Sequence, residues 1–106
     1  MLNAEKILDF ETSREYRRRE KVSVSVLVYY VKRPFIVVTI MNRTHKLEVD
    51  TFAFEEDFSI IEKLYDGDLG NFEIARSTIV KNQDHIRRAL EYLKVRQLEI
   101  EKEGGK

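Results

Sequence analysis

Apolar residues at every second position dominate the middle of the chain and predict β-strands there. From residue 22 to residue 31, one face of a first strand carries Val22, Val24, Val26, Val28 and Tyr30, and the other carries Ser23, Ser25, Leu27, Tyr29 and Val31. A turn at 32–34 contains Pro34, which cannot serve a central strand. A second strand follows over 35–41, and a turn at 42–45 leads to a third over 46–53. The pattern predicts a three-stranded antiparallel meander.

The two turn lengths predict how these strands pair. A three-residue turn places Val28 opposite Val38, and a four-residue turn places Val38 opposite Val49. A one-residue slip would send the apolar set of a strand to the wrong face, so the agreement of both turns favours one register. The predicted inward face consists of Val26, Val28, Ile36, Val38, Ile40, Leu47 and Val49.

The flanking segments predict helices and one more strand. An N-terminal helix is expected from about residue 3 to residue 20, a middle helix over 54–65, and a long C-terminal helix from the cap Asn82 to about residue 102. Alternation over 72–80 predicts a fourth strand, with a short helix as the alternative. The expected fold is α+β: the meander, with that fourth strand, packed by the three helices. Residues 1–103 form one domain in this prediction, and 104–106 a disordered tail.

Composition adds an expectation about origin. Charged residues make up 36% of the 106 residues, cysteine is absent, and glutamine occurs only twice. This bias is typical of proteins that rely on ion-pair networks at high temperature. In composition the chain resembles the small proteins of hyperthermophilic archaea and their viruses, which implies a thermophilic source.

Charge is unevenly distributed although the formal net charge is zero. Residues 13–46 carry a net charge of +7, and residues 47–75 carry −8. Such asymmetry indicates a binding face, or two segments that neutralise each other within one molecule or across a dimer.

Hydropathy argues against a membrane protein. The longest apolar run, from Val26 to Val31, is far shorter than the roughly 20 residues needed to cross a bilayer. The first residues lack the basic and apolar regions of a secretory signal. We therefore expect a cytoplasmic protein with no membrane partner.

Surplus apolar residues predict a homodimer. In the C-terminal helix, one group of apolar residues lies away from the side that we expect to face the core. The second face of the meander is also apolar near the 32–34 turn. The alternatives are a helix end with a few exposed apolar residues, and a sheet face covered by the N-terminal or C-terminal helix. The candidate interface residues are Tyr29, Val31, Phe35, Val37, Phe52, Tyr92, Val95 and Leu98.

A basic run offers a different hypothesis, the binding of DNA or RNA phosphates. On the predicted N-terminal helix, Arg14, Arg18 and Lys21 would line one side. The alternative is an ordinary solvated surface with helix ion pairs such as Glu15–Arg19. The candidate phosphate-binding residues are Arg14, Arg17, Arg18, Arg19, Lys21, Lys32, Arg33 and Arg43.

Catalysis finds little support in the sequence. The sequence contains no glycine-rich phosphate loop and no nucleophile elbow. His45, Glu48 and Asp50 lie close together and suggest a divalent-metal site, but His45 falls on a turn. We expect neither a cofactor nor a bound metal. The leading interpretation is a non-catalytic, homodimeric interaction protein. Its alternatives are a nucleic-acid-binding module and, third, a metal-dependent enzyme.

Overall fold

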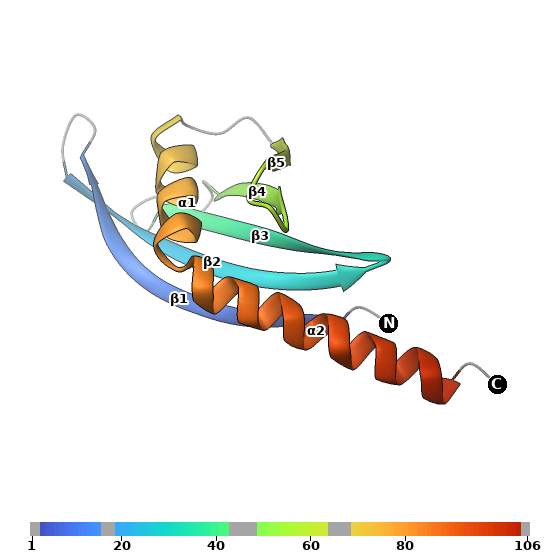
Figure 1. Ribbon diagram of the computed structural model, residues 1–106. Helices are drawn as coiled ribbons and strands as arrows, with labels where there is room; N and C mark the ends of the chain where they lie inside the picture. Colours follow the sequence, from blue (N-terminus) through green and yellow to red (C-terminus); the bar gives the residue numbers. More distant parts are fainter. Residues whose placement is uncertain (1–2, 16–18, 43–48, 64–68, 105–106) are drawn as a thin grey trace.

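The computed structural model describes residues 3–15, 19–42, 49–63 and 69–104. Five strands, β1 (Asn3–Glu15), β2 (Arg19–Val31), β3 (Arg33–Asn42), β4 (Val49–Glu55) and β5 (Ile60–Lys63), precede two helices, α1 (Leu69–Lys81) and α2 (Gln83–Gly104). All neighbouring strands are antiparallel, and their order in the sheet follows the sequence (Figure 1). The fold is α+β with a strand meander. Of the residues that the sequence singled out, those outside the described segments are Arg17, Arg18, Arg43, His45, Lys46, Leu47 and Glu48.

For the first two strands of the meander, the prediction of which side chains face inward is confirmed, but the predicted register is wrong. Val31 lies opposite Arg33, so the turn consists of Lys32 alone, with φ of 68°. This tighter turn shifts the pairing by two residues and places Val28 opposite Ile36. A shift of two residues preserves the face of every side chain. The inward residues of these strands are therefore buried as predicted: Val22, Val24, Val26, Val28, Ile36, Val38 and Ile40.

The predicted register of the next strand pair is wrong, and here the error reverses the faces. Val38 lies opposite Phe52, three residues beyond the predicted partner Val49. Because a shift by an odd number of residues exchanges the two faces, Phe52 and Phe54 enter the core and Val49 lies on the opposite side. The predicted four-residue turn is too short, since β3 and β4 are joined by residues 43–48.

The N-terminal segment is a strand, so the predicted helix over 3–20 is wrong. β1 pairs with β2 along most of its length, from Asn3 opposite Tyr30 to Glu15 opposite Arg19, with a bulge between Lys6 and Leu8. The segment is rich in good helix formers, but helix propensity is worth only a few tenths of a kcal/mol per residue. Pairing along a long, apolar neighbouring strand outweighs it.

The predicted middle helix is absent as well. Residues up to Glu55 complete β4, and β5 returns along it after a tight turn. In this turn the Glu55 amide donates to the Ser59 carbonyl at 2.7 Å, and the Phe58 amide donates to the Glu55 carbonyl at 2.8 Å. Phe58 itself has φ of 71°. The apolar spacing that suggested a helix arises from a strand, a turn and a second strand in succession.

The predicted fourth strand over 72–80 is instead the body of α1, the alternative that the sequence left open. Its buried residues, Asn71, Ala75, Thr78 and Ile79, follow the helical spacing of three and four. The C-terminal helix is confirmed as α2. Asn82 lies at the junction, where its carbonyl accepts from the Ile86 amide at 3.0 Å.

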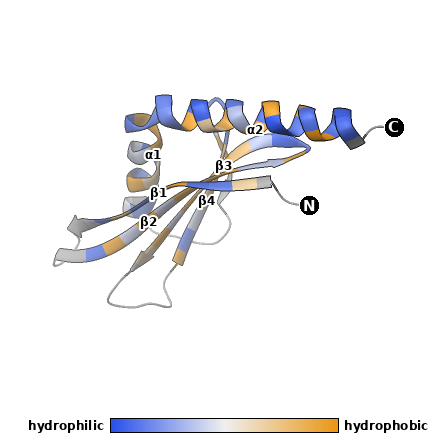
Figure 2. Cartoon of the chain, turned by 90° about the horizontal axis from the view of Figure 1, so that it is seen from below, coloured by the Kyte–Doolittle hydropathy of each residue, from blue (hydrophilic) through white to orange (hydrophobic). Residues whose placement is uncertain are grey.

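Both helices pack on the same face of the sheet, which fixes the layers of the fold. α2 lies along β1 and β2, and α1 lies over β3 and β4 (Figures 1 and 2). The core combines the inward faces of β2, β3 and β4 with the apolar sides of the helices. The helical contribution to this core is Ala75, Ile79, Ile86, Ala89, Leu90 and Leu93.

Candidate interaction surfaces

The sheet face opposite the helices has no cover among the described elements. We call this surface the uncovered face. Its apolar part lies near the Lys32 turn, where Tyr29 opposes Phe35 and Leu27 opposes Val37 across β2 and β3. The rings of Tyr29 and Phe35 stack with centroids 5.3 Å apart and planes inclined by 8°. The alternative in which the N-terminal or C-terminal helix covers this face is wrong, because the N-terminal segment is a strand and both helices lie on the other side.

The predicted interface residues divide between this face and other places. Tyr29, Val31, Phe35 and Val37 all lie on the uncovered face, as the alternation of β2 and β3 predicts. Phe52 does not, because it is fully buried beneath the helices, where its ring meets Phe72 edge-on. The register error between β3 and β4 accounts for its misplacement.

Ion pairs and hydroxyls surround the apolar part of the uncovered face. Arg33 pairs with Glu55 at 3.0 Å beside the aromatic stack, and Lys6 pairs with Asp9 at 3.2 Å on β1. The Ser25 hydroxyl donates to the same Asp9 carboxylate at 3.4 Å. Each of these four charged side chains lies beside an opposite charge.

A second exposed apolar surface lies on α2. Tyr92, Val95 and Leu98 are 57%, 47% and 63% exposed, on the side of the helix opposite the buried Leu90 and Leu93. Figure 1 shows the C-terminal end of α2 projecting past the sheet. We call these three residues the α2 stripe. It points away from the sheet, so it does not join the uncovered face.

The predicted phosphate-binding residues do not form one surface. Arg14 and Arg19 lie at the far end of the β1–β2 hairpin, opposite Glu20 and Glu15 respectively. They are on strands, so the predicted helical alignment with Lys21 is wrong.

The remaining candidates lie at two ends of the sheet. Lys32 and Arg33 lie at the turn between β2 and β3, about 40 Å along the 13-residue β2 from its basic end. Arg33 is also engaged by Glu55. Asn42 lies at the basic end, opposite Val22, so the segment with Arg43 begins there.

A small charged cluster joins the β4–β5 turn to α2. The Lys94 ammonium lies 2.6 Å from Glu56, and this hydrogen bond raises the pKa of Lys94. The Ser59 hydroxyl and amide donate to Asp57 at 2.6 Å and 3.0 Å, and they lower the pKa of that carboxyl. These bonds hold the turn and tie it to α2.

Metal-binding and membrane-spanning features are not found in the described segments. Asp50, the described member of the predicted metal group, is buried and accepts from the Asn71 amide at 2.8 Å. No set of three or more His, Cys, Asp or Glu side chains gathers at a possible metal site within the described residues. Neither described helix combines the length and apolarity needed to span a bilayer.

Comparisons with known proteins add no functional information. The chain matches no protein-family model, no curated protein and no solved structure.

Proposed function

We propose that this protein is a non-catalytic interaction module that self-associates through its uncovered face. The observation that carries the proposal is the one-sided packing of the helices, which leaves Tyr29, Phe35 and Val37 without a covering layer among the described residues. Sheets in proteins normally bury at least one apolar face, and a second layer about 10 Å away would bury this one as well.

The size of the uncovered face suits a second copy of the chain. Four strands spaced about 4.8 Å apart, with the ten-residue length of β3, cover about 600 Å². A specific interface of ordinary size buries about 800 Å² on each partner. Two such faces packed as a sandwich, with modest contributions from their borders, reach that size.

Charge also favours a second copy as the occupant. The chain has no net charge, so two copies approach without long-range repulsion. At the interface itself, the pairs Arg33–Glu55 and Lys6–Asp9 neutralise the border.

Sedimentation velocity across the micromolar range tests the proposal. We expect the wild-type chain to sediment increasingly as a dimer as its concentration rises. Val37→Glu places a charge in the middle of the apolar part and should leave a monomer. Tyr29→Ser, which removes the stacked ring without adding charge, should weaken the dimer at least tenfold.

The matched control is Leu98→Glu, which introduces the same charge on the α2 stripe. We expect this variant to dimerise as the wild type does. A wild-type chain that stays monomeric at high micromolar concentration overturns the proposal. A dimer lost in Leu98→Glu and retained in Val37→Glu also overturns it, because the α2 stripe would then be the interface. Circular dichroism checks that each variant is folded.

Nucleic-acid binding is a second candidate, favoured by the backbone of the hairpin. The β1–β2 register brings Arg14, Arg19 and Lys21 to the sheet end where the segment after Asn42 also begins. A basic β-hairpin is a shape that enters nucleic-acid grooves. In this candidate function, only the basic residues at this end of the sheet would bind nucleic acid, and Lys32 and Arg33 at the opposite end would not.

Fluorescence anisotropy with a short DNA duplex and an RNA hairpin at low salt tests this candidate. Replacing Arg17, Arg18 and Arg19 by Ala should abolish binding, whereas replacing Lys32 and Arg33 at the opposite end should not. Affinity should fall steeply with salt, by about 0.9 logarithmic units per tenfold salt increase for each phosphate contact. Equal losses in both variants, or no binding to either probe, would exclude the hairpin as the binding element.

A further inference from the structure

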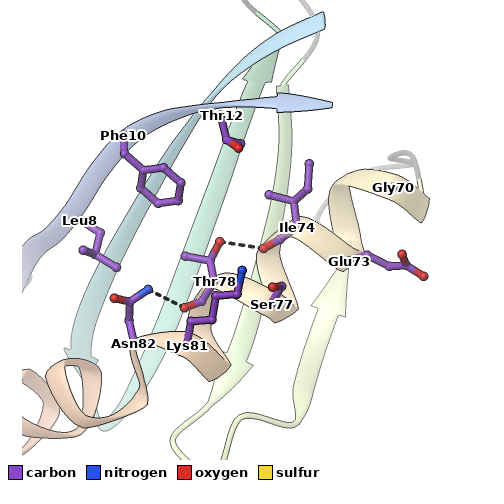
Figure 3. Close-up of a pocket in the computed structure, with 10 residues that line it drawn as sticks. All are labelled: Leu8, Phe10, Thr12, Gly70, Glu73, Ile74, Ser77, Thr78, Lys81 and Asn82. Carbon is purple, nitrogen blue, oxygen red and sulfur yellow. Dashed lines mark hydrogen bonds between the residues drawn. The ribbon is translucent and has the colours of Figure 1, made fainter. Parts of the chain in front are cut away.

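A cavity of about 780 Å³, broadly open to solvent, lies between β1 and α1, on the helical side of the sheet (Figure 3). β1 contributes Leu8, Phe10 and Thr12 to its wall. The opposite wall comes from α1 and its junction with α2, with the residues Gly70, Glu73, Ile74, Ser77, Thr78, Lys81 and Asn82. The volume falls within the range of sites that bind small organic molecules.

The cavity exists because the two helices cover different strands. α2 lies along β1 and β2, whereas α1 packs over β3 and β4 and stands away from β1. As a result Phe10 stays 37% exposed, although it points to the helical side and its cross-strand partner Val24 is fully buried. An inward-facing aromatic residue that stays more than a third exposed marks a space that an apolar group would fill.

Some polar side chains of the cavity wall form hydrogen bonds within the described part of the protein, and others do not. The Thr78 hydroxyl donates to the Ile74 carbonyl at 2.7 Å, and the Asn82 side-chain amide donates to the Thr78 carbonyl at 2.9 Å. Lys81 forms no ion pair with any residue of the described segments. Figure 3 shows its amino group lying along α1 beside Thr78, while the carboxylate of Glu73 points away from β1.

We propose that this cavity binds a small amphipathic anion, an apolar chain or ring that carries one carboxylate. The apolar body would lie against Leu8, Phe10 and Ile74, where its burial supplies most of the affinity. The carboxylate would meet the ammonium of Lys81, the one cationic side chain among the described residues of the cavity wall. A single lysine among the described lining residues suits one carboxylate better than a polyphosphate, which is usually held by several cations.

The test uses dodecanoate and its uncharged analogue dodecanol, below their aggregation concentrations, with the 106-residue chain. Backbone amide shifts from nuclear magnetic resonance locate the ligand, and calorimetry gives its affinity. We expect dodecanoate to bind one per chain, to shift amides in 8–12 and 73–82, and to bind at least tenfold more tightly than dodecanol.

Two variants separate the parts of the site. Lys81→Gln should weaken dodecanoate binding five- to tenfold and leave dodecanol binding unchanged, whereas Lys102→Gln near the end of α2 should alter neither. Ser77→Trp, which places a large ring in the cavity from an exposed position on α1, should obstruct it and weaken binding of both ligands at least tenfold.

Three results would overturn the inference. They are the absence of dodecanoate binding at millimolar concentration, equal affinity for the two ligands, and shifts confined to the uncovered face around Leu27 and Tyr29. None of these readouts depends on whether the chain dimerises, because the cavity and the uncovered face lie on opposite sides of the sheet.

Discussion

Replacing Phe52 by Ala tests the strand register on which the two faces depend. Phe52 is fully buried, lies opposite Val38, and meets the Phe72 ring edge-on at a centroid distance of 5.6 Å. Removing a buried phenylalanine ring loses its transfer free energy and leaves a cavity, which together cost about 3–5 kcal/mol. Because small domains unfold with only about 5–15 kcal/mol, the variant should be close to unfolding.

Urea denaturation followed by circular dichroism at low micromolar concentration measures this loss. The matched control is Phe35→Ala, which removes the same ring from the uncovered face. Phe35 is only partly buried and stacks on Tyr29, so we expect a loss of about 1–2 kcal/mol. If Phe52→Ala costs less than Phe35→Ala, then Phe52 does not lie beneath the helices and the register of β4 described above is incorrect.

Three further predictions concern the turn at Lys32, the hydrogen bond between Ser59 and Asp57, and the ion pair between Glu56 and Lys94. Lys32→Gly should raise the free energy of unfolding by about 1 kcal/mol in urea denaturation, because Lys32 has φ of 68° and glycine adopts that conformation without steric cost. Ser59→Ala removes the hydroxyl that bonds Asp57, so the pKa of Asp57 measured by nuclear magnetic resonance should rise toward 3.8. The wild-type bond therefore stabilises the fold above pH 3.8, and this contribution is lost as the pH falls through the lowered pKa. Glu56→Gln should cost less than about 1 kcal/mol at neutral pH, since its pair with Lys94 is solvent-accessible. The pKa of Lys94 is raised, so that small contribution should disappear above pH 10.5. No change for Lys32→Gly, or an unshifted Asp57 pKa in Ser59→Ala, would contradict the respective reasoning.

The meander was predictable because side chains along a strand point alternately to the two faces of the sheet, and apolar and polar residues alternate in the sequence in the same way. From Val22 to Tyr30 in β2, every second residue is valine or tyrosine, and any antiparallel partner must place those residues on one side. The faces of Tyr29, Phe35 and Val37 follow from the same alternation. Turn length does not follow from it, and the single-residue turn at Lys32 was therefore missed.

The N-terminal and middle segments were mispredicted because local preference does not decide their structure. β1 contains Ala, Glu, Lys and Leu, which favour helices, yet Leu8, Phe10 and Thr12 alternate with acidic residues as an edge strand requires. The strand forms because β2 offers a partner along its whole length. No local signal reports a partner that is distant in sequence.

The cavity between β1 and α1 could not be predicted for the same reason. Leu8 and Phe10 were assigned to a helix, and the region of Ser77 and Lys81 to a strand and its end. Only the placement of α1 over β3 and β4, away from β1, brings these residues together around an empty volume.

The most direct test of self-association through the uncovered face is an isotope-filtered nuclear Overhauser experiment on a mixture of labelled and unlabelled chains. The proposed dimer predicts intermolecular contacts between the Tyr29 ring of one chain and the Leu27 or Val37 methyls of the other. Contacts that arise only from Leu98 and Val95 would place the interface on the α2 stripe and contradict the proposal. The absence of any intermolecular contact in a concentrated sample would contradict it as well.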